Sequence, residues 1–349
     1  MYAYLQIQRR RDQQLRENGL SQWFTLTAPT LGSPSATSPS SVLRSALAGQ
    51  DLVISTGGGG GGNYYADQTR LVNAAVQARV PRFVPAEFGA DSLSAGVAGR
   101  LPPHAARARL VGFLRAMESE GSSEQQQQQP PEPVANGGSN GCAGANGCCA
   151  HDHGNGDDQV EVRTSGGFHD PFSWVAVAAG TLLGERLGDL GFDVKWQSAT
   201  VYYGSGSGDR QASFAVSSLG WVGRSVARVV ERWESVRNCY LYAAGCVTTA
   251  DEVVACLQKA TGKEWSVGEV EVEECVREAE RCLQRGFPDA GIALMERSVL
   301  YDTSLGAVES FRTKSANDLL GLGQEKVEDI VTGAVHDFQN HGRADCGCS

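Results

Sequence analysis

The sequence predicts an α/β protein built on a parallel β-sheet, and residues 51–91 carry most of this signal. Residues 51–55 form a short apolar and β-branched run, and residues 57–62 are consecutive glycines. Apolar residues then recur at helical spacing over residues 66–78, and residues 80–85 form a second apolar run. A strand, a glycine turn, a helix and a second strand in this order predict a βαβ unit with parallel strands.

The glycine run between the predicted strand and helix suits an anion-binding turn. Glycine has no Cβ, so its backbone reaches positive φ and brings N–H groups close to a phosphate. The run also satisfies the dinucleotide-binding spacing G-x-G-x-x-G. A glycine homopolymer matches any glycine pattern, so an expanded flexible loop is the alternative. On the first interpretation, Gly57, Gly58 and Gly59 are candidate cofactor-binding residues.

Two longer motifs lie in the same unit. Residues 68–75 read Q-T-x-L-V-x-A-A, and residues 82–89 read R-F-V-P-A-E-F-G. They resemble the NmrA-like and isoflavone reductase-like family of atypical short-chain dehydrogenases/reductases, in which the second motif reads R-F-[IV]-P-S-E-F-G. Only Ala86 departs from that pattern. The resemblance implies a Rossmann-like parallel sheet in which the two predicted strands are the fourth and the fifth.

The same resemblance implies a cofactor and a substrate class. It implies NADPH as cofactor, with Glu87, Phe88 and Gly89 beside its nicotinamide half. It further implies an oxidoreductase that acts on a small, aromatic or otherwise apolar molecule. In such an enzyme the cofactor transfers the hydride, and the protein supplies position and polarisation.

The first strand of the family and its glycine turn are missing. The family opens with an apolar strand and G-x-x-G-x-x-G, whereas residues 1–22 hold one glycine and no strand of adequate length. Residues 23–28 fit the family's second strand, residues 32–41 suit a loop, and residues 41–48 suggest a short helix. The sheet is therefore predicted to be N-terminally incomplete, without the helix N-terminus that receives a pyrophosphate. Either the chain is a truncated gene product, or it does not bind a dinucleotide in the usual way.

Composition and charge argue against several other functions. The formal net charge is −10, and the only basic cluster, at residues 9–16, is interrupted by an acid, which disfavours a nucleic-acid partner. No apolar run reaches the roughly 18 residues of a membrane span, and no secretory signal is evident. The ten cysteines follow no disulfide framework and suit reduced thiols. We expect a cytoplasmic monomer or homodimer whose partner is a small-molecule substrate, with no membrane partner.

Residues 119–158 interrupt the pattern with a glutamine tract, prolines and an asparagine- and glycine-rich run. Because this stretch offers little that folding could bury, we predict a disordered insertion. It contains soft metal ligands but no C-x-x-C spacing, so we predict no metal site. These ligands are Cys142, Cys148, Cys149, His151 and His153.

After the insertion the family pattern resumes. Residues 159–164 predict a strand, and residues 165–170, S-G-G-F-H-D, resemble the family's T-G-x-F-x-D turn, where the chain begins to line the substrate pocket. The resemblance therefore implies Gly167, Phe168 and His169 as pocket residues.

The remainder predicts a smaller C-terminal α+β substrate lobe. Residues 193–203 and 211–216 suggest a strand pair joined by a glycine loop, residues 219–232 a helix, and residues 240–244 a strand. Thr248 or Thr249 is expected to cap the next helix. The predicted organisation is an extension (1–22), a truncated nucleotide-binding lobe (23–118), the insertion (119–158), the rest of the sheet with the substrate lobe (159–338) and a tail (339–349).

The catalytic lysine of the family is replaced. In the family, this lysine lies on the helix after E-F-G, orients the nicotinamide ribose and relays a proton. Aligning the apolar positions of that helix puts Arg107 in its place, and no lysine occurs within residues 1–194. Arginine can hold an oxyanion but is a poor general base. Arg107 and His169 are therefore the catalytic candidates, with His104 as a further titratable group; the alternative is a surface arginine and ordinary hydrogen-bonding histidines.

Three interpretations stay open. The family resemblance favours an NADPH-dependent reductase. The loss of the lysine favours a non-catalytic dinucleotide sensor, as in the NmrA branch. The missing first strand favours a degenerate family member without cofactor affinity.

Overall fold

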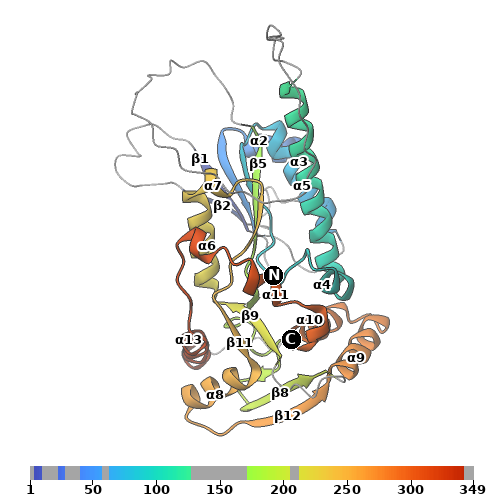
Figure 1. Ribbon diagram of the computed structural model, residues 1–349, viewed down its shortest axis with the longest axis vertical. Coiled ribbons are helices and arrows are strands. Elements are labelled where there is room, and N and C mark those ends of the chain that lie inside the picture. The colour runs from blue at the N-terminus through green and yellow to red at the C-terminus, as the bar shows by residue number, and fades with distance from the viewer. Residues whose placement is uncertain are drawn as a thin grey trace, which may run out of the picture.

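The computed structural model describes residues 4–9, 23–27, 40–56, 63–126, 171–204 and 212–341 of the 349 residues. The molecule is elongated, with one large sheet in its upper half and a lobe of small sheets and helices below it (Figure 1).

The predicted βαβ unit is present. It consists of β3 (Gln50–Ser55), α3 (Tyr64–Gln77) and β4 (Arg82–Val84). The two strands are parallel, with Val53 opposite Phe83. The short helix predicted before this unit is also present, as α2 (Ser40–Leu47).

Two further strands extend the parallel sheet. β5 (Ser173–Ala178) pairs with β4, and β10 (Cys239–Tyr242) pairs with β5, both in parallel. β10 confirms the strand predicted at residues 240–244. β5 was not predicted, although its six residues form a fully buried run. The strand predicted at residues 159–164 lies outside the described residues.

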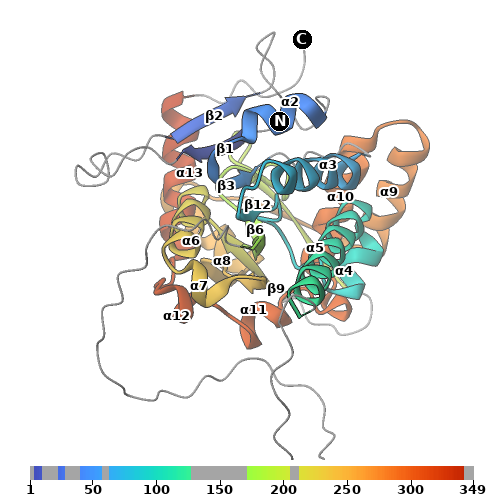
Figure 2. The same cartoon turned by 90° about the horizontal axis from the view of Figure 1, so that it is seen from above.

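Helices cover both faces of this sheet (Figures 1 and 2). On one face, α2, α3 and α5 (Pro102–Gln126) bury leucines against the sheet residues Phe83 and Trp174. On the other face, α6 (Leu219–Glu231) and α7 (Trp233–Val236) bury tryptophans against β4 and β5. A sheet buried on both faces explains why its strands read as continuous apolar runs. The Rossmann-like α/β prediction is thereby confirmed.

The long helix α5 differs from the prediction at its end. It continues through Gln126, so residues 119–126, which we assigned to the disordered insertion, are helical. Residues 119–126 include two glutamates and two glutamines, and these residue types favour helix. The remaining residues of the predicted insertion lie outside the described part of the chain.

The N-terminal edge of the sheet corrects a second prediction. β1 (Tyr4–Arg9) is a strand, although we expected none of adequate length there, and it pairs antiparallel with β3. β2 (Trp23–Thr27), the strand expected at residues 23–28, pairs antiparallel with β1. β1 lies between β3 and β2, so β2 forms this edge of the sheet, and the alternating sequence of β1 suits an antiparallel strand. Its carboxyl end points to the opposite edge from that of β3, so the described residues provide no parallel strand in the place of the family's first strand.

The lower lobe contains two three-stranded sheets. One holds β6 (Thr181–Leu182), β9 (Ser213–Ser217) and β11 (Cys246–Thr249), and the other holds β7 (Phe192–Asp193), β8 (Ser198–Tyr203) and β12 (Ser266–Glu271). The predicted pairing of residues 193–203 with 211–216 is wrong, because β8 pairs with β7 and β12 whereas β9 pairs with β6 and β11.

Helices complete this lobe. Thr249 caps α8 (Ala250–Thr261) in a capping box with Glu252, as predicted. The helix predicted at residues 219–232 is α6. The remaining elements are α4 (Ala95–Arg100), α9 (Val272–Gln284), α10 (Pro288–Tyr301), η1 (Thr303–Leu305), α11 (Glu309–Thr313), α12 (Asn317–Leu320) and α13 (Val327–His341).

Candidate functional site

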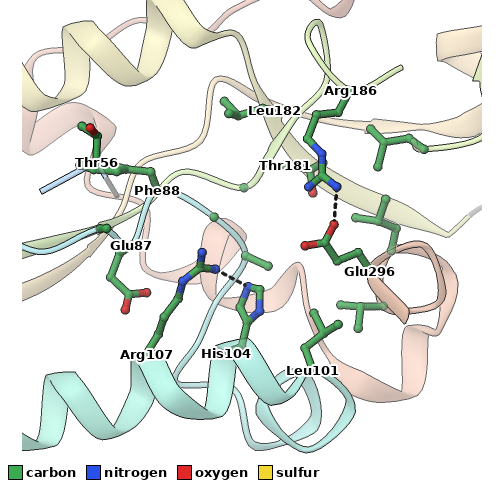
Figure 3. A pocket seen from close by; sticks show the side chains of 17 residues that line it. Thr56, Glu87, Phe88, Leu101, His104, Arg107, Thr181, Leu182, Arg186 and Glu296 are labelled. Atoms are coloured by element: carbon green, nitrogen blue, oxygen red, sulfur yellow. Dashed lines mark hydrogen bonds and ion pairs between the residues drawn. The ribbon is translucent and has the colours of Figure 1, made fainter. Parts of the chain in front are cut away.

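A cavity of about 200 Å³ lies between the sheet and the lower lobe. Its walls come from the turn after β4, the turn after β5, the first turns of α5, and α10 (Figure 3). β4 and β5 are parallel, so both turns lie at the carboxyl edge of the sheet, where ligands of open α/β sheets bind. This cavity is the candidate active site.

The floor of the cavity joins the two turns. The carbonyl oxygen of Gly89 accepts hydrogen bonds from the backbone N–H groups of Ala179 (3.1 Å) and Gly180 (3.0 Å). Phe88 has φ of +28°, a conformation that non-glycine residues rarely adopt. Gly180 has φ of +72°, and a Cβ there would lie 2.5 Å from the carbonyl oxygen of Ala215. The backbone conformation of both turns therefore restricts which residues can form this floor.

Two side chains of α5 meet at one end of the cavity. A guanidinium nitrogen of Arg107 lies 3.2 Å from Nε2 of His104, one helical turn away (Figure 3). Arginine only donates, so Nε2 accepts and the proton of the neutral ring sits on Nδ1. A Cβ on Gly89 would lie 3.3 Å from the same guanidinium nitrogen. Glycine at this position thus leaves space around the pair.

The pair carries one positive charge. His104 is 4% exposed, and burial together with the charge of Arg107 lowers the pKa of His104 to about 3. Arg107 therefore provides the only charge of the two at neutral pH. Its guanidinium also lies 5.6 Å from the ring centre of Tyr64. Within the described part of the chain, no carboxylate lies within ion-pair distance of Arg107. Two nitrogens of the pair, Nε of Arg107 and Nδ1 of His104, are also buried without a hydrogen-bond partner among the described residues.

Glu87, on the same side of the cavity, is a buried acid. One carboxyl oxygen accepts hydrogen bonds from the hydroxyls of Ser92 (2.8 Å) and Tyr240 (3.4 Å), and the other has no partner among the described residues. Burial raises the pKa of Glu87 to about 7, and Arg107 opposes part of that shift. Glu87, rather than His104, is thus the group that gains and loses a proton near neutral pH.

The opposite wall also contains an arginine, but a paired one. Arg186 binds Glu296 of α10 at 2.6 Å and Asp189 at 3.2 Å. Apolar side chains lie between the two ends of the cavity, and they are Leu101, Leu182, Leu190, Val299 and Leu300. The cavity is therefore an apolar space with an unpaired cation at one end and an ion pair at the other.

The structure brings together part of the predicted site. Glu87, Phe88, Gly89, His104 and Arg107 all line the cavity. The predicted cofactor-binding residues Gly57, Gly58 and Gly59 and the predicted pocket residues Gly167, Phe168 and His169 lie outside the described residues, and their roles stay predictions.

Sequence reasoning missed the opposite wall. Arg186 and Glu296 lie far apart in the chain, and no local motif marks either of them. The stretch L-L-G-E-R-L at residues 182–187 places Arg186 beside a glutamate and among leucines, which does not mark a site.

Other kinds of site find no support in the described ranges. No group of three His, Cys, Asp or Glu side chains there could hold a metal ion. The five cysteines that lie in these ranges form no disulfide bond. None of the described helices combines the length and the apolar character needed to cross a membrane.

A parallel sheet with helices on both faces and a cavity at its carboxyl edge defines a Rossmann-like α/β protein. Residues 25–122 match the sequence model of the NmrA-like family. The resemblance drawn from the motifs of residues 68–75 and 82–89 is thereby confirmed.

Comparison with individual proteins agrees with this result. Oxidoreductase aprR of Aspergillus flavus is 26% identical over 288 residues, which cover 82% of this chain and 77% of the relative. The crystal structure of isoflavone reductase superposes with a TM-score of 0.54 at 15% identity, covering 86% of this chain and 80% of the other. An NADPH-dependent quinone oxidoreductase of Escherichia coli, solved with NADPH, gives 0.50 at 15% identity, covering 86% and 82%.

Proposed function

We propose that this protein is an NADPH-dependent oxidoreductase that acts on a small, aromatic or otherwise apolar molecule in the cavity. The observation that carries the proposal is the convergence of the E-F-G turn and the Arg107–His104 pair on one apolar cavity at the carboxyl edge of the sheet. Relatives named as oxidoreductases and reductases with this fold support the same class of reaction. We place the activity in the cytoplasm, on a monomer or homodimer.

The described residues suit one half of NADPH better than the other. Glu87, Phe88 and Gly89 would lie beside its nicotinamide half, and the bound cofactor would supply the hydride. The pyrophosphate half would need a glycine turn at the carboxyl edge of the parallel strands. The strand beside β3 is β1, which is antiparallel and ends at the opposite edge of the sheet, so it cannot supply that turn. The remaining candidate is the run Gly57, Gly58 and Gly59. We therefore expect NADPH to bind, but far more weakly than to a chain with the complete fingerprint.

Within the cavity, each polar group has a distinct proposed role. Arg107 holds and orients an oxygen of the substrate, because it is a cation whose described partners are uncharged. His104 stays neutral and fixes the guanidinium of Arg107 through Nε2. Glu87 holds a proton near neutral pH and can recover it through Ser92 and Tyr240.

Two measurements test this function. Isothermal titration with NADPH and NADP⁺ should give weak but saturable binding, and NADPH oxidation should be accelerated by a member of a panel of quinones, aromatic ketones and enones. Arg107→Lys should raise turnover at saturating cofactor and substrate, because lysine restores the proton-relaying group of the family, whereas Arg107→Ala should not. A chain that binds neither nucleotide contradicts the proposal.

A second function has one observation in its favour. Arg107 stays protonated, so the position that carries the catalytic lysine in the family no longer exchanges a proton. A non-catalytic dinucleotide sensor would bind NADPH or NADP⁺ without oxidising NADPH in the presence of any substrate in the panel. Binding without turnover, unchanged in Arg107→Lys, would favour this sensor over the reductase.

A further inference from the structure

The two arginines of the cavity differ in what neutralises them. Arg186 is paired with Glu296 and Asp189, so that end carries no net positive charge. Within the described residues, the hydrogen-bond and ring partners of Arg107 are the neutral His104 and Tyr64. Glu87, the buried acid at the same end, has a pKa of about 7 and so leaves this end positive below that pH. The cavity therefore has a positive end and an end without net positive charge.

The helix that carries Arg107 strengthens the positive end. Arg107 lies in the second turn of α5, whose first turn contains no acidic residue. α5 begins with two prolines, which have no N–H group, and its next two N–H groups are bonded to the carbonyl oxygen of Leu101, so the helix acts on an anion through its dipole alone. The charge of Arg107 and the helix dipole thus act in the same direction on a group in the cavity.

Buried donors at this end lack acceptors. Nε of Arg107 is a donor, and Nδ1 of His104 is a donor because Nε2 accepts from Arg107. Both atoms are buried without a described partner, and His104 is only 4% exposed. Because neither atom is open to the cavity, a ligand there would instead meet the remaining N–H groups of the Arg107 guanidinium, which carries five donors.

The size and lining of the cavity limit what such a ligand can be. Its volume of about 200 Å³ is slightly larger than the ~150 Å³ of a cavity that accommodates benzene. Its middle is lined by leucine and valine side chains, so it suits one ring rather than a phosphorylated sugar. A planar carboxylate also matches the fork of an arginine, which binds it through two parallel hydrogen bonds.

We propose that the cavity binds a small monocarboxylic acid with one ring or a short apolar body, and that Arg107 holds its carboxylate while the apolar body lies against Leu182 and Val299. This inference rests on the proposed function only in taking the cavity as the substrate site. The ion pair of Arg186 and Glu296 would then face the far end of the ligand, where a hydroxyl or carbonyl finds both a donor and an acceptor (Figure 3).

The test uses the full chain without nucleotide, so it does not depend on NADPH binding. Benzoate, 4-hydroxybenzoate and cinnamate are titrated and compared with their uncharged amides by isothermal titration or ligand-observed NMR. We expect each acid to bind at least tenfold more tightly than its amide. Equal binding of acid and amide, or no binding of any acid at millimolar concentration, overturns the proposal.

Three variants assign the binding to Arg107. Arg107→Met should abolish the preference for the acid, and Arg107→Lys should keep part of it, because a single charge remains without the fork. Arg109→Met is the matched control, since Arg109 is exposed on the same helix and stacks 4.2 Å from the ring centre of Tyr65. Thermal melts of all three establish folding. An undiminished preference in a folded Arg107→Met overturns the proposal.

A further titration tests whether this end of the cavity binds a carboxylate or the phosphates of a nucleotide. Inorganic pyrophosphate is titrated against the wild type and Arg107→Met. Weak binding that does not depend on Arg107 supports the carboxylate, whereas Arg107-dependent binding tighter than that of benzoate overturns it. If the acids bind as expected but NADPH does not, the proposed oxidoreductase fails while the carboxylate site stands.

Discussion

The two ends of the cavity each contain an arginine and a glutamate, but the two pairs behave differently. At one end, Arg186 and Glu296 lie 2.6 Å apart and form an ion pair. At the other end, Glu87 turns one carboxyl oxygen to Ser92 and Tyr240, and Arg107 turns to His104. The comparison teaches that residue type does not decide whether a charge is available to a ligand. The partners within hydrogen-bond distance decide it.

The largest expected effect separates the two arginines. In the NADPH-dependent reaction, Arg107→Met should lower kcat/KM by roughly 100-fold or more, because it removes a charged hydrogen bond to the substrate. Arg186→Met should lower kcat/KM by much less, since Arg186 is already occupied by carboxylates. Steady-state kinetics on the two variants measure the difference. Equal losses would show that the two ends are equivalent.

The next effect concerns the glutamates and depends on pH. Burial raises the pKa of Glu87 from its usual 4.5 to about 7, against the opposing charge of Arg107. Its protonated form therefore stabilises the folded state fully below pH 4.5, and this stabilisation is lost as pH rises through 7. Glu87→Gln should remove this dependence of stability on pH. The free energy of unfolding of the variant minus that of the wild type should therefore rise by on the order of 2 kcal/mol between pH 4.5 and pH 8.

Urea unfolding at both pH values measures this change. Glu296→Gln, which removes a carboxylate from the other end of the cavity, is measured in parallel as the control. A wild type and a Glu87→Gln variant whose stabilities run parallel from pH 4.5 to 8 would show that folding does not raise the pKa of Glu87.

A smaller effect is expected from breaking the ion pair. Glu296→Gln should lower the free energy of unfolding by about 1 kcal/mol, a modest value because both side chains are about a quarter exposed. It should also leave Arg186 with Asp189 as its remaining carboxylate partner. A dicarboxylic acid such as terephthalate should then bind more tightly than to wild type, with benzoate unaffected. Unchanged terephthalate affinity would show that Asp189 alone neutralises Arg186.

The smallest effect is expected at Gly89. Alanine there would place Cβ 3.3 Å from the guanidinium nitrogen of Arg107, so that the guanidinium must shift by a few tenths of an ångström. Gly89→Ala should weaken benzoate binding severalfold and change the free energy of unfolding by less than about 1 kcal/mol. Gly112→Ala, on the exposed side of α5, has nothing within 4 Å of the added Cβ and should leave binding unchanged. Identical benzoate affinities in both variants would contradict the close approach.

The part of the fold that sequence could predict is the part with local signals. The unit of β3, α3 and β4 follows from two apolar runs, a glycine turn and a helical repeat, and the cap at Thr249 follows from its own four residues. The partners of β8 and β9 were wrong, because an alternating pattern identifies a strand but not the strand beside it. β5 was missed even though its sequence, S-W-V-A-V-A, is a buried apolar run.

The same distinction applies to the site. The motif of residues 82–89 identified Glu87, Phe88 and Gly89, and the helix after it identified Arg107 and His104. Their hydrogen bond follows from a spacing of one helical turn. The unusual pKa of Glu87 could not be predicted, because it arises from burial in the folded protein, which the charge of Arg107 and the hydrogen bonds from Ser92 and Tyr240 only partly oppose. Arg186 and Glu296 are brought together by the tertiary packing of α10 in the lower lobe, which no local sequence pattern reveals.

The hydrogen bonds around the cavity have a consequence for how fast a ligand binds. Gly89 ties the turn after β4 to the turn after β5, and Arg186 ties the second turn to α10 through Glu296. Arg100 of α4 then ties α10 to the helices beside the sheet, through Ser298 and Asp302. Walls that are joined in this way need no rearrangement on binding. In stopped-flow mixing, the observed rate should therefore rise linearly with ligand concentration, in a single exponential phase and without a plateau.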